Sequence, residues 1–214
     1  MSATPRLRKR RKEARPAELA AAALGLFVEK GFAATRLEDV AARAGVSKGT
    51  LYLYFDNKEA LFKAVIQDGI VPVMVENEEI AARHTGCSFE LLEKLLANWW
   101  SRIGQTDFAG IPKLMVAEAR NFPEIARFYY ESVIRRGRAL VGSALERGMT
   151  SGEFRRMDVE TTIDVIIAPI LMLLIWQFSL ASCQNDVVDS RHYLQTHIDL
   201  LRQGLRRLEA ETQV

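Results

Sequence analysis

The sequence has few of the residues from which metal sites and disulfide frameworks are built. It has two cysteines, Cys87 and Cys183, far apart along 214 residues. Such usage predicts neither a disulfide framework nor a cysteine metal motif, and it suits a reducing cytoplasm. The three histidines also lack ligand spacing, because the gap between His192 and His197 places them well apart around a helix. We therefore expect no metal and no cofactor.

Enzyme and membrane signatures are missing as well. We find no Gly-rich phosphate loop and no Gly-x-Ser-x-Gly elbow, so we do not expect an enzyme. The basic N-terminus is followed by no apolar stretch, which excludes a signal peptide. The most apolar run, Val165 to Trp176, has 12 residues. It is too short to span a bilayer and predicts a buried helix.

What the sequence does have is an uneven charge. Residues 1–63 contain 13 Lys/Arg and 7 Asp/Glu, a net charge of +6, whereas residues 64–214 contain 16 and 20, a net charge of −4. A basic head on an acidic body predicts a polyanionic partner for the head alone. Apolar residues make up 49% of the chain, enough for a substantial core.

The N-terminal residues 1–14 are strongly basic and have no apolar period, so we expect a disordered arm. Its basic residues could follow phosphates or enter a minor groove, although a solvated tail is the alternative. The arm residues that we assign are Arg8, Lys9, Arg10 and Arg11. A helix with one apolar face should follow from about Pro16 to Lys30, and Gly31 should end it.

Two short helices joined by a tight turn are predicted within Leu37 to Lys58, LEDVAARAGVSKGTLYLYFDNK. Thr35 and Glu38 have the spacing of a capping box for the first helix. Gly45 suits a turn that needs a positive φ, and Ser47 suits the cap of the second helix. These offsets are typical of a helix-turn-helix, in which the second helix enters the DNA major groove.

The residues of the second helix divide into a core side and a DNA-reading side. Gly49 permits close approach to DNA, Thr50 can contact a base, and Tyr52 can reach a phosphate or a thymine methyl. Tyr54 has a competing place in the core. The predicted DNA contacts are Thr35, Arg36, Lys48, Gly49, Thr50, Tyr52, Tyr54 and Lys58.

Residues 15–66 resemble the DNA-binding domain of TetR-family transcriptional regulators, most specifically in GVSKGTLYLYFDNKEAL. The resemblance implies an all-α fold with a helix-turn-helix DNA-binding domain at 15–62 and a larger helical domain for effector binding and dimerisation at 63–214. It also implies that Thr35 and Lys58 hold the DNA backbone. Because so short a reading helix needs a second copy one DNA turn away, we expect a symmetric homodimer on a palindromic operator in double-stranded DNA. Repression relieved by a ligand is the family's commonest mode, so we expect a repressor that an effector releases.

Periodicity and punctuation predict further helices in the body. Asp56 or Asn57 should cap a helix that Pro72 kinks or splits. The others are expected at about 89–105, 112–120, 123–147, 159–182 and 190–210.

The last two predicted helices are the best dimer candidates, because the first of them is apolar nearly all round. A core helix inside a monomer is the alternative. The predicted dimer contacts are Ile163, Ile167, Leu171, Leu174, Tyr193, Ile198, Leu201 and Leu205.

Aromatic and methionine side chains in the body suggest a mostly apolar effector pocket with few polar groups, although such a set is more often plain core. We assign to this pocket Trp99, Arg102, Ile103, Met115, Glu118, Phe122, Tyr129, Met172 and Trp176. The expected effector is small and hydrophobic or aromatic. Two alternatives stay open: a regulator without an effector, and a helical adaptor that binds protein in place of DNA.

Overall fold

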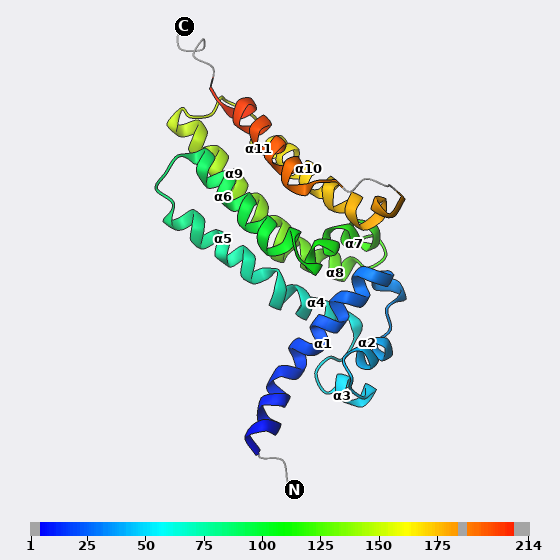
Figure 1. Cartoon of the computed structure of the whole chain (residues 1–214). Coiled ribbons are helices and arrows are strands. Elements are labelled where there is room, and N and C mark those ends of the chain that lie inside the picture. Colours follow the sequence, from blue (N-terminus) through cyan, green and yellow to red (C-terminus); the bar gives the residue numbers. More distant parts are fainter. Residues whose placement is uncertain (1–4, 184–187, 208–214) are drawn as a thin grey trace. The chain divides into compact units, whose positions relative to one another are not determined.

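The computed structural model describes residues 5–183 and 188–207, and they are helical almost throughout (Figure 1). Within the described residues the extended pairing is limited to one isolated antiparallel bridge, between Phe154 and Arg206. The predicted all-α fold is confirmed.

The chain divides into two compact units that do not follow the predicted boundary at residue 62. Unit 1 runs to Pro72 and also contains Leu114–Ser132. Unit 2 contains Val73–Lys113 and the chain from Val133 onward. The division differs from the prediction because α8 (Pro123–Tyr129) packs on α4 (Lys58–Gly69), a contact between segments that local sequence patterns do not connect.

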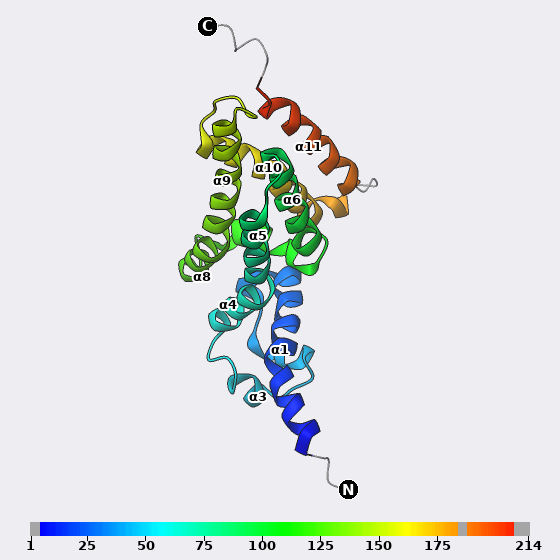
Figure 2. The same ribbon diagram turned by 90° about the vertical axis from the view of Figure 1, so that its left-hand side faces the viewer.

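Unit 1 is built around α1 (Pro5–Ala34), which packs against α4 and α2 (Leu37–Arg43). The rings of Phe27, Phe32 and Phe62 form its centre, with centroids 5.3–5.6 Å apart. All three side chains are fully buried. A short helix, α3 (Lys48–Tyr52), follows α2 (Figures 1 and 2).

Helix α1 starts earlier than predicted. We expected residues 1–14 to be disordered, but the backbone is helical from Pro5, and residues 1–4 lie outside the described part. Arg, Lys, Glu, Ala and Leu are good helix formers, and together with a proline in the first turn they favour this continuation. The helix breaks at Gly31, where φ is +83°, as its glycine predicted.

The predicted capping box at α2 is wrong. The N-cap is Arg36, and its side chain makes no capping hydrogen bond. The Thr35 hydroxyl instead donates to the carbonyl oxygens of Gly31 (2.7 Å) and Leu26 (3.2 Å), at the end of α1. The hydroxyl thereby ties the chain before α2 to the last turns of α1.

The turn between α2 and α3 has the predicted chemistry. Gly45 adopts φ +65°, a conformation that glycine takes without strain. The Ser47 hydroxyl accepts a hydrogen bond from the Thr50 backbone N–H at 3.1 Å and so caps α3. Asn57, one of the two predicted caps, does the same for α4 through the backbone N–H of Ala60. The helix-turn-helix is thus held by local interactions.

Unit 2 is a bundle in which α6 (Ser88–Trp99) lies along α9 (Arg135–Ser151), and α10 (Val159–Ser179) contacts α9 and α11 (Ser190–Leu205) (Figures 1 and 2). The remaining elements of the chain after α4 are mostly short. They are α5 (Val71–Arg83), η1 (Trp100–Gly104), η2 (Asp107–Ala109), α7 (Gly110–Glu118), η3 (Tyr130–Ile134) and η4 (Ala181–Cys183). Of these, α5, α7 and η3 cross the boundary between the units.

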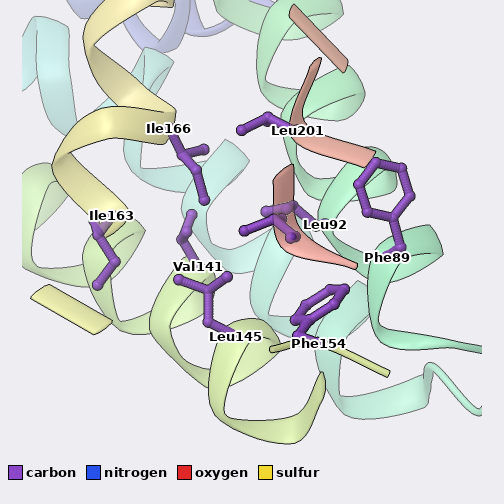
Figure 3. Close-up of a cluster of buried hydrophobic side chains, with 9 residues drawn as sticks. Phe89, Leu92, Val141, Leu145, Phe154, Ile163, Ile166 and Leu201 are labelled. Carbon is purple, nitrogen blue, oxygen red and sulfur yellow. The ribbon is translucent and has the colours of Figure 1, made fainter. Parts of the chain in front are cut away.

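Two of the predicted body helices contain wide π-type turns at η1 and η3. At η1, a Cβ on Gly104 would lie only 2.3 Å from the Trp100 ring, so glycine is needed there. The core shown in Figure 3 joins Phe89 and Leu92 of α6 to Val141 and Leu145 of α9. The other side chains labelled there are Ile163 and Ile166 of α10, Leu201 of α11, and Phe154.

Helix α10 is 21 residues long and is apolar enough, by length and composition, to cross a membrane. It nevertheless places Ile163, Ile166 and Leu174 in the core of unit 2. At its start, Glu160 and Asp164 pair with Arg138 of α9. Buried contacts and ion pairs within the chain are typical of a helix that belongs to a protein core.

Candidate nucleic-acid interface

The exposed side of α3 is the candidate surface for reading DNA. Leu51 is fully buried and anchors α3 to unit 1, while Tyr52 and Leu53 are 43% and 80% exposed. Gly49 is also exposed and carries no side chain that would keep DNA at a distance. An aromatic ring and a leucine exposed beside a glycine have no role in the core, and they fit contact with base edges.

Two polar residues of α3 are held by neighbouring side chains. The Lys48 ammonium forms an ion pair with Glu38 of α2 and lies 5.8 Å from the centroid of the Tyr52 ring. The hydrogen bond to Glu38 raises the pKa of Lys48 and lowers the pKa of the carboxyl. The Thr50 and Ser47 hydroxyl oxygens lie 2.9 Å apart. Lys48 and Thr50 thus each have a partner within the helix-turn-helix.

Lys58 is not available as a DNA contact, contrary to the prediction. Its ammonium donates to three carbonyl oxygens at the end of α1, those of Phe32 (2.6 Å), Ala33 (3.0 Å) and Thr35 (3.0 Å). It also lies over the Phe32 ring at 4.6 Å from the centroid. Burial lowers its pKa. Because an ammonium has three hydrogens, no donor is left for a phosphate.

The predicted DNA contact of Thr35 is wrong for the same reason. Its side chain is 1% exposed, and its hydroxyl donates to the Gly31 carbonyl oxygen of α1. Arg36 is exposed at the start of α2, and its contact with DNA stays a prediction. Tyr54 is half-buried, which agrees with the competing core position that its spacing suggested. Arg8, Lys9, Arg10 and Arg11 now fall on the helical backbone of α1.

The predicted effector residues divide between unit 1 and unit 2. Glu118 accepts a hydrogen bond from the backbone N–H of Ala33 at 3.1 Å, and the Phe122 ring packs on Phe32 with centroids 4.7 Å apart. Both residues therefore pack within unit 1, which carries α3 and is called the DNA-reading unit below. The buried side chains of Met115 and Tyr129 belong to the same unit.

The other predicted effector residues lie in unit 2. Arg102 forms a surface ion pair with Glu76 at 2.8 Å, and Met172 is 56% exposed, so both are wrong as pocket residues. Ile103 is core, while Trp99 and Trp176 are half-buried. None of the predicted residues lines the groove of about 440 Å³ that α10 and α11 form around Pro169, Tyr193 and His197.

The predicted dimer contacts are partly wrong. Ile163, Leu174, Leu201 and Leu205 are buried inside unit 2 and cannot meet another chain without unfolding. Ile167, Leu171, Tyr193 and Ile198 are half-buried. Other apolar side chains of the same two helices are exposed. They are Val165 and Met172 of α10 and Leu200 of α11, at 61%, 56% and 65%. An all-apolar helix does not reveal from its sequence which face points inward.

The support that Leu114–Ser132 gives to unit 1 was missed, because the contact between Glu118 and Ala33 joins residues 85 apart in the chain. No local pattern marks such a contact. The ion pair between Glu38 and Lys48 was missed as well. The sequence indicates it only weakly, through opposite charges on the two helices of the helix-turn-helix.

Comparison with known proteins agrees with this geometry. Residues 19–65 match the model of bacterial regulatory proteins of the tetR family. Residues 83–181 match the model of the tetracyclin repressor-like C-terminal domain.

Among relatives, the transcriptional repressor KstR2 of Rhodococcus jostii is 28% identical over 190 residues, which are 88% of this chain and 91% of that protein. The structure of the ketosteroid transcriptional regulator KstR2 of Mycobacterium tuberculosis is similar in fold, with a TM-score of 0.72 at 22% identity over 91% of this chain and 96% of that one.

FadR of Bacillus subtilis, in complex with stearoyl-CoA, has a TM-score of 0.67 at 21% identity over 89% of this chain and 99% of that one. The two domain matches together, on a helix-turn-helix with an exposed reading helix, place this chain in the TetR family of DNA-binding transcriptional regulators.

Proposed function

We propose that this protein is a repressor that binds a palindromic operator as a homodimer and is released by a small, mostly hydrophobic effector. The observation that carries the proposal is the exposed side of α3, where Lys48 pairs with Glu38, Thr50 contacts Ser47, and Tyr52 and Leu53 are 43% and 80% exposed. A cytoplasmic location, where its DNA target would be, belongs to the same proposal.

The need for a second copy follows from the size of α3. With five residues, α3 can contact only a few base pairs. Two copies related by a two-fold axis would place a second α3 about 34–36 Å away, one DNA turn along the operator. The exposed face of Val165, Met172 and Leu200 supplies an apolar surface for such a contact.

Support for an effector comes from relatives and from chain continuity. One similar structure is a ketosteroid transcriptional regulator and another is a regulator in complex with stearoyl-CoA, and both ketosteroids and the stearoyl chain are hydrophobic. Helix α7 starts in unit 2 and ends in unit 1, where Glu118 accepts a hydrogen bond from the backbone N–H of Ala33 near the end of α1. A ligand that shifts α7 would therefore act on the DNA-reading unit, and DNA would weaken ligand binding by the same factor.

A regulator without a small-molecule effector is the second candidate. It is favoured by the positions of Arg102, Glu118, Phe122 and Met172, which were predicted to line a pocket and are engaged elsewhere or exposed. On this account the protein would respond to its own concentration or to another macromolecule.

The proposal is tested by mobility shift on the promoter DNA next to the protein's own gene, over a range of salt concentrations. We expect sequence-specific binding that weakens steeply with salt, because phosphate contacts release counterions. Steroids and long-chain acyl-CoA compounds are then titrated into the complex. Release by one of them supports the effector, whereas binding that no compound changes favours the second candidate. Failure to bind any DNA specifically would overturn both.

A further inference from the structure

A carboxylate stands at the DNA-reading surface where phosphates would repel it. Glu38, near the start of α2, forms an ion pair with Lys48, the first residue of α3. The two side chains keep 50% and 57% of their surface exposed. Lys48 in turn lies 5.8 Å from the Tyr52 ring, so carboxylate, ammonium and ring form one connected group.

The exposure of this ion pair leaves it a small part in the stability of the fold. Exposed ion pairs add little to stability. The N-cap of α2 is Arg36, and in the first turn the Glu38 carboxylate accepts a hydrogen bond from its own backbone N–H as well as pairing with Lys48. Two other ion pairs, Glu29 with Arg43 and Asp39 with Lys30, already join α1 to α2. Glu38 differs from those acids in pairing with the reading helix.

The chemistry of the pair fits discrimination between DNA sequences. A carboxylate raises the cost of docking on any phosphate backbone, while it can accept a hydrogen bond from the cytosine amino group. An ammonium held beside it is kept from phosphates and can donate to guanine O6 and N7. Lys48 begins α3 and Lys58 begins α4. Because the Lys58 ammonium is bonded to carbonyl oxygens near the end of α1, Lys48 is the one of these two lysines that can contact DNA.

We propose that Glu38 is a specificity-determining residue, which holds Lys48 toward the base edges and penalises binding to DNA without the operator. The inference rests on the proposed DNA-binding function and deepens it. In the Glu38→Gln variant, Lys48 is free to contact a phosphate of any sequence. Affinity for non-operator DNA should then rise while affinity for the operator stays or falls.

The test compares wild type and Glu38→Gln on the footprinted operator and on a random duplex of equal length. We expect binding to the random duplex to strengthen roughly three- to tenfold, and the slope of log K against log salt to steepen by about 0.9 per head. Operator affinity should not rise with it, so the ratio of the two affinities falls. Glu38→Gln combined with Lys48→Gln should cancel the steeper slope.

Asp39→Asn is the matched control, because it removes the neighbouring charge of α2 whose partner is Lys30 and not Lys48. It should leave the affinity ratio unchanged. An unchanged ratio in Glu38→Gln, or an equal rise on both duplexes, would overturn the role of Glu38. If wild type itself shows no preference for the operator, the proposed function fails instead.

Discussion

At the scale of single residues, the main finding is that two side chains expected on DNA are used to close the end of α1. Thr35 and Lys58 both bind carbonyl oxygens there. Their residue types suit either role, since a hydroxyl and an ammonium donate equally well to carbonyls and phosphates. The spacing of the motif could therefore predict that these residues matter, but not which acceptor they meet.

Lys58→Met should destabilise the protein, because it leaves three carbonyl oxygens, two of them in partly buried hydrogen bonds, without their charged donor. We expect the free energy of unfolding to fall by about 2 kcal/mol. Urea denaturation measures the change. Lys30→Met is the control, since Lys30 makes an exposed ion pair at 3.4 Å and its loss should cost less than about 0.5 kcal/mol. Equal losses in the two variants would contradict the account.

Gly45→Ala should also destabilise, by about 1–2 kcal/mol, because φ at this position is +65° and a Cβ is strained there. Nothing lies within 4 Å of the added Cβ, so the cost is one of backbone conformation alone. Gly49→Ala provides the contrast. Its methyl should leave the urea midpoint unchanged or raised, and should weaken operator binding. A stable Gly45→Ala would show that the turn is more permissive than its φ indicates.

At the scale of helices, the sequence predicted most of the elements and fewer of their contacts. Gly31, Gly45 and Ser47 act locally, so their effects could be predicted from neighbours in the chain. The inward face of α10 could not be predicted, because apolar residues surround it and only packing on α9 and α11 selects a side.

The contact between α10 and α11 predicts a dependence on pH. His197 of α11 lies with Nε2 2.9 Å from the Ile166 carbonyl oxygen, and the Tyr193 hydroxyl donates to the Pro169 carbonyl oxygen at 3.0 Å. Burial lowers the pKa of His197 below its usual 6.5. The unfolded chain therefore binds a proton more readily than the folded one, and stability falls as the pH drops below about 6.5.

Urea midpoints measured from about pH 8 to pH 5 test this dependence. His197→Gln should reduce the loss of stability on the acid side, because the titrating group is removed. His192→Gln, an exposed histidine of the same helix, should follow the wild-type curve. A His197→Gln variant with an unchanged pH profile would contradict the assignment.

At the scale of the whole molecule, the unit that carries the reading helix is assembled from two parts of the chain. Residues of Leu114–Ser132 complete it, through Glu118 at Ala33 and Phe122 at Phe32. Local sequence patterns could not predict this arrangement, because neither Glu118 nor Phe122 lies in a motif that indicates its contact with α1.

Dimer formation should depend on the exposed face of α10 and α11. Met172→Asp together with Leu200→Asp should shift the protein toward a monomer in sedimentation at micromolar concentration, because two charges would be buried in an apolar interface. Val75→Asp is a control at an exposed valine of α5. A dimer that survives the double substitution would place the interface on another surface.

The most direct test of the central claim is operator binding by a variant with Lys48→Ala, Thr50→Ala and Tyr52→Ala together. The three substitutions leave the buried core unchanged, so the circular dichroism spectrum and the urea midpoint should stay near those of wild type. We expect operator affinity to fall at least about a hundredfold, because base contacts contribute roughly 1–3 kcal/mol each. Unchanged operator affinity in a folded triple variant would contradict the assignment of α3 as the reading helix.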